Sequence, residues 1–94
     1  MPEGHGVVDR PDRGRFELPV GDAVAVAHYR REGDRVVLTH TEVPRSLSGK
    51  GIGSRLAHGV FEAIRSGGRR VVAECPVMAA YAAKHPEHAG MVDS

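Results

Sequence analysis

A glycine-rich stretch, Ser48-Gly49-Lys50-Gly51-Ile52-Gly53-Ser54, divides the sequence into two halves with different hydrophobic patterns. Glycine accepts backbone conformations that other residues avoid, and it lets another molecule approach the main chain closely. The residues that follow have the apolar spacing of a helix, whose first turn presents unpaired N–H groups and a partial positive charge. The stretch therefore predicts a strand-to-helix junction that binds an anion, most often a phosphate group.

The residues before this stretch alternate between apolar and polar types, which is typical of strands. We expect short strands at residues 7–8 and 15–18 and longer strands over 23–31 and 35–43. In the last strand, period-two alternation places one set of side chains on each face of the sheet. One set is Val36, Leu38, His40 and Glu42, and the other is Val37, Thr39, Thr41 and Val43. The first half therefore predicts an antiparallel meander.

The residues after the stretch change to a helical pattern. From Gly51 onward, apolar side chains recur at every fourth position, which predicts an amphipathic helix. Residues 70–75 read as a short strand, and Pro76 stands where prolines open helices. A second helix over 77–84 must end before Pro86, because the residue preceding a proline is pushed out of the helical region.

The order of these elements predicts an α/β fold of the mixed (α+β) kind. We expect a mostly antiparallel sheet of four or five strands, with two helices and one parallel pair formed by a strand–helix–strand crossover. A chain of 94 residues has room for one domain, so residues 1–94 are expected to form a single unit. Residues 1–6 and 89–94 read as loose tails.

Composition excludes several classes of function. The net charge is +1 and only 4% of the residues are aromatic, which argues against binding nucleic acid through charge or base stacking. No apolar run approaches the roughly 20 residues that span a bilayer, so no membrane partner is expected. With one cysteine, no disulfide can form within the chain, which fits the reducing cytoplasm where we expect the protein.

Two common phosphate loops do not match the glycine-rich stretch. A nucleotide P-loop requires G-x-x-x-x-G-K-[ST], but Lys50 is followed by Gly51 and the first glycine position falls on Pro44. A dinucleotide fingerprint requires G-x-G-x-x-G, and its third glycine position is Ser54. A glycine-rich turn that binds no ligand remains the structural alternative.

Three motifs in order resemble the GNAT acetyltransferase superfamily. The stretch 48–54 with Leu56 is similar to its acetyl-CoA loop, [Q/R]-x-x-G-x-[G/A]. Together with the segment 40–44 and a third motif made of 75–81 with 85–87, it resembles the small, single-domain, GNAT-like N-acetyltransferases of the YjdJ type. The resemblance extends from about Phe16 to His88, which is most of the chain, and it implies a minimal GNAT-like fold.

The resemblance implies that acetyl-CoA binds at the loop. The residues expected to contact it are Val43, Ser48, Gly49, Lys50, Gly51, Ile52, Gly53 and Ser54. The leading Arg or Gln of the motif, which helps hold the pyrophosphate, falls on Ser48. Ser48 can instead cap the helix, and Lys50 or Arg45 can supply the missing charge.

Cys75 is the first candidate catalytic residue. It stands at the end of a strand and before a helix, where a thiol becomes more nucleophilic and can accept an acetyl group. The resemblance places this Cys-Pro pair beside the cofactor thiol. The alternative is a small buried apolar residue, as free cysteines usually are. Direct transfer and an acetyl-Cys75 intermediate both remain open.

Three other side chains are candidates for proton transfer. His40 can act as a base, and Glu42, expected on the same face, can act as a base or orient His40. The resemblance suggests Tyr81 as the acid that protonates the leaving thiolate, although a packing role is the alternative. A metal site at His85-Pro86-Glu87-His88 is disfavoured, since proline breaks the helical geometry that would bring both imidazoles to one face.

The resulting hypothesis is an acetyl-CoA-dependent N-acetyltransferase that takes acetyl from a small-molecule donor and passes it to an amine. The alternative is a non-catalytic acyl-CoA-binding module, a sensor or carrier, and a weaker one is a protein-interaction domain. Larger GNAT enzymes shape the acceptor pocket with helices between their first two main strands. Here only residues 19–22 join those strands, so the acceptor side is expected to be open and the acceptor and oligomeric state stay undetermined.

Overall fold

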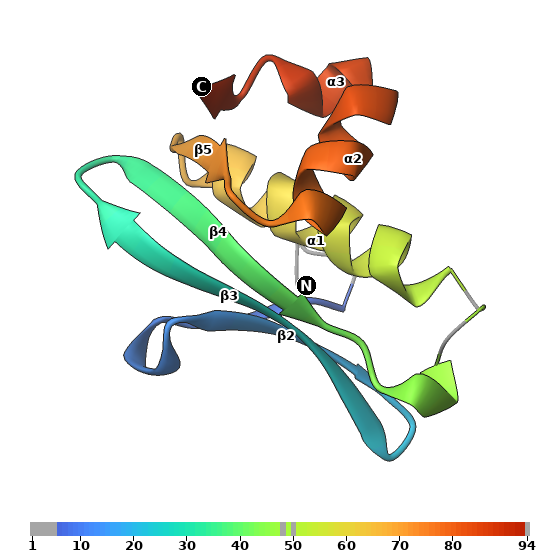
Figure 1. The fold of residues 1–94 in the computed structure, drawn as a ribbon. Helices are drawn as coiled ribbons and strands as arrows, with labels where there is room; N and C mark the ends of the chain where they lie inside the picture. The colour runs from blue at the N-terminus through green and yellow to red at the C-terminus, as the bar shows by residue number, and fades with distance from the viewer. Residues whose placement is uncertain (1–5, 48, 50, 94) are drawn as a thin grey trace.

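A single mixed sheet of six strands forms the centre of the computed structural model, which describes residues 6–47, 49 and 51–93 (Figure 1). The strand order is β1-β2-β3-β4-β5-β6. The elements in chain order are β1 (Val8–Arg10), η1 (Pro11–Arg13), β2 (Arg15–Val20), β3 (Ala23–Glu32), β4 (Arg35–Glu42), η2 (Arg45–Leu47), α1 (Ile52–Ser66), β5 (Arg70–Ala73), α2 (Pro76–Lys84), α3 (Pro86–Ala89) and β6 (Val92–Asp93). The mixed α+β class expected from the sequence is confirmed, with more strands and one more helix than predicted.

The first four strands form the expected antiparallel meander. β1 pairs with β2, β2 with β3, and β3 with β4, each antiparallel. The turn between β3 and β4 contains Gly33 at φ 63°, a left-handed conformation that favours glycine. Sequence alternation and turn residues therefore predicted the order and the antiparallel pairing of these strands correctly.

A bulge in the β3–β4 ladder reverses the predicted faces of β4. Tyr29 pairs with Leu38, but the preceding His28 pairs with His40, so Thr39 is an extra residue in β4. Leu38 and Tyr29 belong to the hydrophobic core. Beyond the bulge, Thr41 pairs with the core residue Ala27, so Thr41 lies on the core face. The prediction that His40 and Glu42 share a face with Leu38 is therefore wrong, because an extra residue reverses the alternation.

The parallel pair predicted after the glycine loop is present and short. β4 and β5 pair from Arg35↔Arg70 to Leu38↔Ala73. The N–H groups of Glu74 and Cys75 both bond to the carbonyl of Leu38, and the chain then turns into α2. β4 continues to Glu42, so its last four residues have no strand partner on this side among the described residues.

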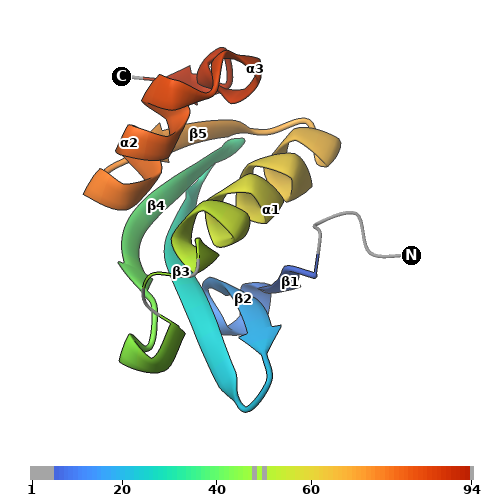
Figure 2. The same ribbon diagram turned by 90° about the vertical axis from the view of Figure 1, so that its right-hand side faces the viewer.

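The two longer helices, α1 and α2, pack against each other and against the sheet (Figure 2). α1 buries an apolar stripe that includes Leu56, Val60, Phe61 and Ile64, as its sequence predicted. It packs on β2, β3 and β5, and α2 packs on β4, β5 and α1. Within the described part of the chain, no helix combines the length and apolar character needed to cross a membrane.

The end of the chain differs from the loose tail that we expected. α2 ends at Lys84 as predicted, but Pro86 then opens α3, since proline suits the first position of a helix. β6 follows and pairs in parallel with β5. Asp93 accepts bonds from Arg35 (Nε–Oδ2 3.2 Å) and Arg70 (Nε–Oδ1 2.8 Å), which fix β6 beside β5. A two-residue strand carries no sequence signal of its own, because its partners supply the stabilisation.

Candidate functional site

The glycine-rich loop leads directly into the first turn of α1. Gly49 and Gly51 have φ values of 79° and 71°, which favour glycine at both positions. Gly51 is the N-cap of α1 and makes no side-chain cap bond, whereas the sequence suggested Ser48. Ser48 and Lys50 lie outside the described residues. The intrahelical bonds begin with the Arg55 N–H and the Gly51 carbonyl, 3.1 Å apart, so the first turn offers its N–H groups to a ligand.

Gly53 stands in the first turn of α1 without a steric reason inside the described chain. A Cβ at this position would meet nothing within 4 Å among the described residues, and the φ of Gly53 is helical. Glycine within a helix costs about 0.5–1 kcal/mol relative to alanine. Gly53 therefore lowers helix stability and leaves open space in front of the N–H groups of the first turn. This arrangement would let a ligand approach those groups closely.

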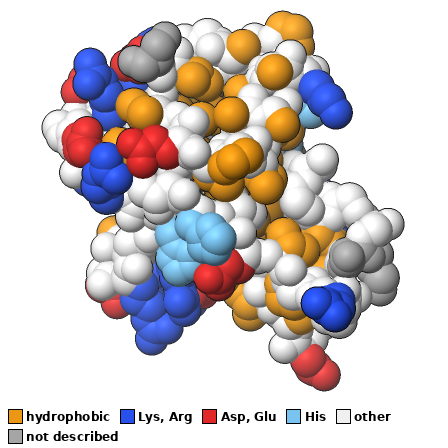
Figure 3. All heavy atoms as spheres, viewed as in Figure 1, with side chains coloured by type: hydrophobic (Ala, Val, Ile, Leu, Met, Phe, Trp, Pro, Cys, Tyr) orange, Lys and Arg blue, Asp and Glu red, His pale blue; other side chains and the backbone are white. Residues whose placement is uncertain are grey.

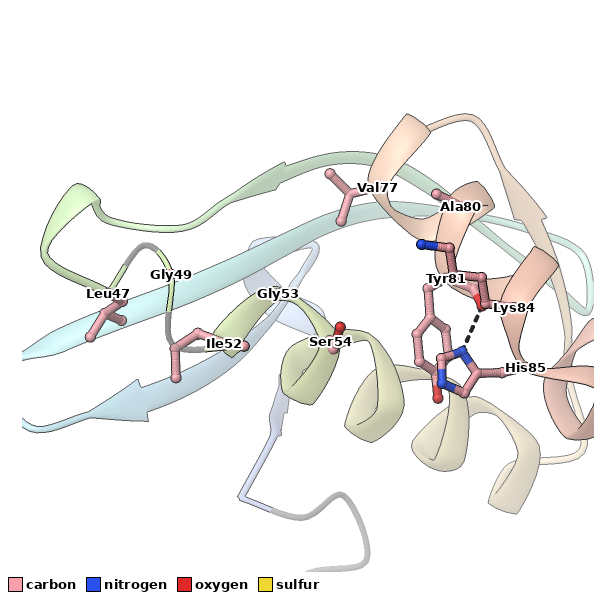
Figure 4. Close-up of a pocket in the computed structure, with 11 residues that line it drawn as sticks. Leu47, Gly49, Ile52, Gly53, Ser54, Val77, Ala80, Tyr81, Lys84 and His85 are labelled. Carbon is pink, nitrogen blue, oxygen red and sulfur yellow. Dashed lines mark hydrogen bonds between the residues drawn. The ribbon is translucent and has the colours of Figure 1, made fainter.

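A groove of about 390 Å³ separates the loop from α2 (Figure 4). One wall contains the predicted cofactor residues Gly49, Gly51, Ile52, Gly53 and Ser54, together with Leu47. The other wall is a face of α2 that continues to His85, formed by Val77, Ala80, Tyr81, Lys84 and His85. Figure 4 shows the Lys84 amine extending over this space between the two walls.

A second groove of about 350 Å³ continues from the first. Its lining residues are Ser54, Arg55, His58, Tyr81 and His85, three of which also line the first groove. Arg55 and Lys84 bring positive charge to the two grooves, and His85 adds an imidazole between them. The combined space therefore suits an elongated ligand that carries negative charge.

Tyr81, a predicted catalytic residue, turns its hydroxyl into a chain of polar side chains. Its oxygen lies 3.0 Å from His88 Nδ1 and 3.1 Å from His58 Nδ1. His88 Nε2 in turn lies 2.7 Å from Glu62 Oε2, and His88 is 0% exposed. The Tyr81 ring stacks on His85, with 3.9 Å between the ring centres. Tyr81 thus connects the groove to the buried imidazole of His88 and, through it, to the partly buried carboxylate of Glu62.

This chain of polar groups changes the acidity of two of its members. The bond from His88, followed by that from Arg65, lowers the pKa of Glu62 to about 2. Burial, helped by the nearby charges of Glu87 and Glu62, raises the pKa of Tyr81. At neutral pH Glu62 is therefore ionised and Tyr81 keeps its proton.

Cys75 is the N-cap of α2 and is buried. Its sulfur lies 3.0 Å from Thr41 Oγ1, on the part of β4 beyond the bulge. Cys75 is not among the described residues that line the two grooves. It stands instead where β4 and β5 separate. Val43 follows the last residue of β4 and is partly buried against the core.

His40 and Glu42 lie together on the face of the sheet opposite to Thr41 and Cys75. His40 Nε2 is 3.5 Å from Glu42 Oε2, and His28 Nε2 is 3.7 Å from the same oxygen. The side chains of His40 and Glu42 are 64% and 59% exposed. Histidine and acidic side chains meet over the β3–β4 hairpin on the face in Figure 3. The bulge places these two predicted residues and Thr41, which touches Cys75, on opposite faces.

The residues that surround Tyr81 were only partly identified from the sequence. His85 and His88 were considered there as metal ligands alone, and His58, Glu62 and Lys84 were not singled out as site residues. One signal was available: Tyr81, His85 and His88 follow at i, i+4 and i+7, and His58 and Glu62 are four apart on α1. Pro86 concealed it, because two separate helices continue the same face. Among the described residues, no group of three or more His, Cys, Asp or Glu side chains forms a metal-binding cluster.

The fold and the groove together define a small α+β domain whose glycine loop and helix N-terminus face a largely apolar helix that ends in Lys84. Comparison with known proteins identifies its family. The family model described as GCN5-related N-acetyl-transferase matches residues 15–91, so the chain belongs to the GCN5-related N-acetyltransferase family. A search of curated proteins found no match.

A solved structure supports the fold. The NMR solution structure of a GCN5-like protein from Staphylococcus aureus aligns with a TM-score of 0.71. The alignment covers 100% of this chain and 92% of that chain, at 21% sequence identity. At this identity the likeness shows the fold alone, and it confirms the GNAT-like architecture expected from the sequence motifs.

Proposed function

We propose that this protein is an N-acetyltransferase that binds acetyl-CoA in the groove between the glycine loop and α2 and transfers the acetyl group to an amine. The observation that carries the proposal is the open first turn of α1, which faces a groove whose opposite wall includes Lys84. Family membership supports acetyl transfer in general. The donor, the acceptor class and the residue roles are our inference.

The pyrophosphate of acetyl-CoA fits the loop end of the groove. The N–H groups of Ile52, Gly53 and Ser54 would bind its oxygens, and the helix dipole favours the negative charge there. Lys84 from α2 and Arg55 from α1 would balance the remaining charge. Lys84 and Arg55 would thus help hold the pyrophosphate. In the family motif, an Arg or Gln at the position of Ser48 has this role.

The thioester fits the place where β4 and β5 separate. β4 continues past its last partner in β5, which leaves an open strand edge beside Cys75 and Thr41. An acetyl group held along this edge would lie near the Cys75 sulfur. The Thr41 hydroxyl, 3.0 Å from that sulfur, would orient it. We propose that Cys75 either positions the thioester or takes the acetyl group before the amine does.

The acceptor would approach from the exposed face of the sheet. His40 and Glu42 lie there, beside the open end of β4. We propose that His40 removes a proton from the incoming ammonium group and that Glu42 orients its imidazole. Tyr81, whose raised pKa keeps the phenol protonated at neutral pH, would supply the proton to the departing thiolate.

Substitution of Gly53 by alanine tests the cofactor site. Because Gly53 has a helical φ and open surroundings, the methyl group should raise helix stability by about 0.5–1 kcal/mol while filling the approach to the N–H groups. We expect calorimetry to show acetyl-CoA binding at least 10-fold weaker in a variant that melts at the same temperature or higher, since one lost charge-assisted bond has about this effect. Unchanged affinity would remove the loop from the cofactor site.

A matched pair of glycines controls for backbone strain. Gly51 and Gly33 have φ values of 71° and 63°, and a Cβ at either would meet nothing within 4 Å among the described residues. Alanine at either position should cost about 1–2 kcal/mol, the penalty of the left-handed conformation. Only Gly51→Ala should weaken acetyl-CoA binding, because Gly33 lies in the hairpin before β4, away from the loop.

Release of free thiol from acetyl-CoA, measured with a panel of amines, separates the two functions that the sequence left open. An acetyltransferase releases thiol in proportion to acetylated amine. A protein that binds acetyl-CoA tightly and releases none would instead be an acyl-CoA-binding module. If calorimetry detects no binding at millimolar acetyl-CoA, both functions are excluded.

The route through Cys75 requires its own measurement. Cys75→Ala removes the sulfur and leaves a small apolar side chain in a buried position. With a covalent route, turnover stops and intact-protein mass spectrometry of the wild type shows an added acetyl group. Retained turnover in the variant, with no mass shift in the wild type, would establish direct transfer.

A further inference from the structure

The environment of Tyr81 contains a buried pair that neither the motif nor the proposed mechanism uses. We propose that His88, held by Glu62, is a positioning residue that sets the direction of the Tyr81 hydroxyl proton during acetyl transfer. The inference rests on the proposed function, in which Tyr81 protonates the departing thiolate. It adds two residues from different helices to the machinery of the reaction.

The donors and acceptors around the Tyr81 oxygen explain how His88 can set the direction of the Tyr81 hydroxyl proton. A phenol has a single O–H, but the Tyr81 oxygen contacts two imidazole nitrogens, His88 Nδ1 at 3.0 Å and His58 Nδ1 at 3.1 Å. Tyr81 can donate to only one of them at a time. His88 is fully buried, and its Nε2 lies 2.7 Å from the ionised Glu62, so Nε2 carries a proton that it donates to this carboxylate.

The charge of His88 then selects between two arrangements. When His88 is neutral, its Nδ1 has no proton and accepts the Tyr81 O–H, which therefore points into the protein. When His88 is doubly protonated, Nδ1 donates to the Tyr81 oxygen, and the phenol proton is directed away from His88. Only the second arrangement makes this proton available on the side of the grooves, because Tyr81 lines both of them.

The proton transfer balances in the second arrangement. As the C–S bond breaks, its electron pair stays on sulfur, which takes the proton from the Tyr81 oxygen. The phenolate takes the proton of His88 Nδ1, and the Tyr81 O–H is restored. His88 becomes neutral, still donating to Glu62, and regains a proton from solvent before the next turnover. The attacking amine releases its own proton separately, so the products are an amide and a free thiol.

The charged and titratable groups around the pair come from all three helices. α1 contributes Glu62, whose carboxylate also accepts two bonds from Arg65, and His58. α2 contributes Tyr81 and is followed by His85, and α3 contributes Glu87, whose charge acts on Tyr81. Glu62 makes the shortest of these contacts with His88, 2.7 Å. Because the proposed step uses the doubly protonated His88, activity should fall on the alkaline side of the pH profile.

The pH profile of thiol release tests this assignment. In Glu62→Gln, the doubly protonated His88 loses its partner charge, so the alkaline limb of kcat should move to lower pH by about 1–3 units, with KM for acetyl-CoA unchanged. The matched control is Arg65→Gln, which changes the other partner of Glu62 and keeps the contact with His88. Arg65→Gln should leave the alkaline limb of kcat almost unchanged or move it to higher pH. An unmoved limb in a folded Glu62→Gln protein would overturn the inference.

Tyr81→Phe provides a second test with a different readout. It removes the hydroxyl and keeps the ring against His85, and thiol release should fall about 100-fold or more, the contribution of a general acid. Wild-type turnover in this variant would overturn the role of Tyr81, and with it that of His88. The proposed function would still hold, provided that the wild-type protein releases thiol.

Imidazole ¹⁵N NMR tests the proton on His88 without any activity. In the wild type, both ring nitrogens of His88 should be protonated at the acidic end of the pH range in which the protein is folded, and Glu62→Gln should lose the Nδ1 proton at a lower pH than the wild type. A His88 that stays singly protonated over the whole range in which the protein is folded would overturn the inference. This result is independent of whether the protein transfers acetyl groups.

Discussion

Two clusters in this protein contain two histidines and a glutamate each, and they differ in their surroundings. On the open face of the sheet, His28 and His40 lie 3.7 and 3.5 Å from Glu42. Between the helices, His88 lies 2.7 Å from Glu62, and His58 joins them through Tyr81. The first cluster is largely exposed to solvent, whereas His88 is 0% exposed.

The comparison shows how burial changes what the same residue types do. Water screens the exposed cluster, so its ion pairs contribute little to stability and its members can meet an incoming substrate. In the second cluster, the fully buried His88 depends on its protein partners, because no water replaces a bond that it loses. This difference agrees with the proposed roles, in which the exposed cluster meets the acceptor and His88 sets the direction of the Tyr81 proton.

Removal of one histidine from each cluster should give the largest difference. His88→Ala leaves a cavity and removes a bond from both Tyr81 and Glu62, so we expect the free energy of unfolding to fall by about 2–4 kcal/mol. His40→Ala should change it by less than about 0.5 kcal/mol, as exposed substitutions usually do. Urea denaturation followed by circular dichroism measures both. If the two variants lost similar amounts of unfolding free energy, the buried histidine would not contribute more to stability than the exposed one.

The two glutamates should differ in how their contribution depends on pH. The pKa of Glu62 is lowered to about 2 from an ordinary value of 4.5, so its ionised form stabilises the folded protein above about pH 4.5. This contribution is lost as the pH falls through about 2. Glu62→Gln should therefore lower stability by about 1–3 kcal/mol at neutral pH, a difference that closes toward pH 2.

The matched variant for this experiment is Glu42→Gln. It should change the free energy of unfolding by less than about 0.5 kcal/mol at neutral pH, because exposed ion pairs contribute little. Denaturation at several pH values, with both variants and the wild type, measures the difference. A Glu62→Gln protein whose stability loss is the same at pH 2.5 and pH 7 would show that its carboxylate charge is not the cause.

Double-mutant cycles should sharpen the comparison further. Tyr81→Phe combined with His88→Gln should show an interaction energy of about 1 kcal/mol, since the two side chains share one hydrogen-bonded chain. The rings of His28 and His40 stack with 5.9 Å between their centres, on the exposed face. Their cycle, with glutamine at each position, should give an interaction energy of less than about 0.3 kcal/mol. Equal interaction energies would remove the distinction between the clusters.

His40→Gln should have the smallest effect on stability of these variants and a large effect on the rate of thiol release. His40→Gln keeps a polar side chain on the exposed face, and its melting temperature should match that of the wild type. If His40 accepts the proton of the amine, thiol release should fall about 100-fold at neutral pH and recover partly at higher pH, where more of the amine is already deprotonated. A turnover rate equal to that of the wild type would exclude His40 as the base.

Several features could be predicted from the sequence because they depend on neighbours along the chain. Alternation predicted the strands up to Glu42, and four-residue spacing predicted α1. Pro76 and Pro86 marked the start and the end of α2. The glycine loop and the order of the motifs were sufficient to recognise the GNAT superfamily, which the family model and the fold confirm. Each of these signals is local, since turns, caps and periodicity involve only a few successive residues.

Other features required the tertiary structure. A single extra residue at Thr39 reversed the faces of β4, and nothing in the alternation of that strand announced it. The pairing of Glu62 with His88 joins residues 26 positions apart, so spacing along the chain could not suggest it. β6 exists because β5 and two arginines hold it.

The sequence by itself determined the elements, their order and the loop that is suited to an anion. Only the tertiary structure decided which histidines are buried, which glutamate each one contacts and which face of the sheet each occupies. The physical reason is that burial and long-range contacts depend on how the elements pack. The same His and Glu side chains therefore form an open, solvated cluster in one place and a buried, hydrogen-bonded pair in another.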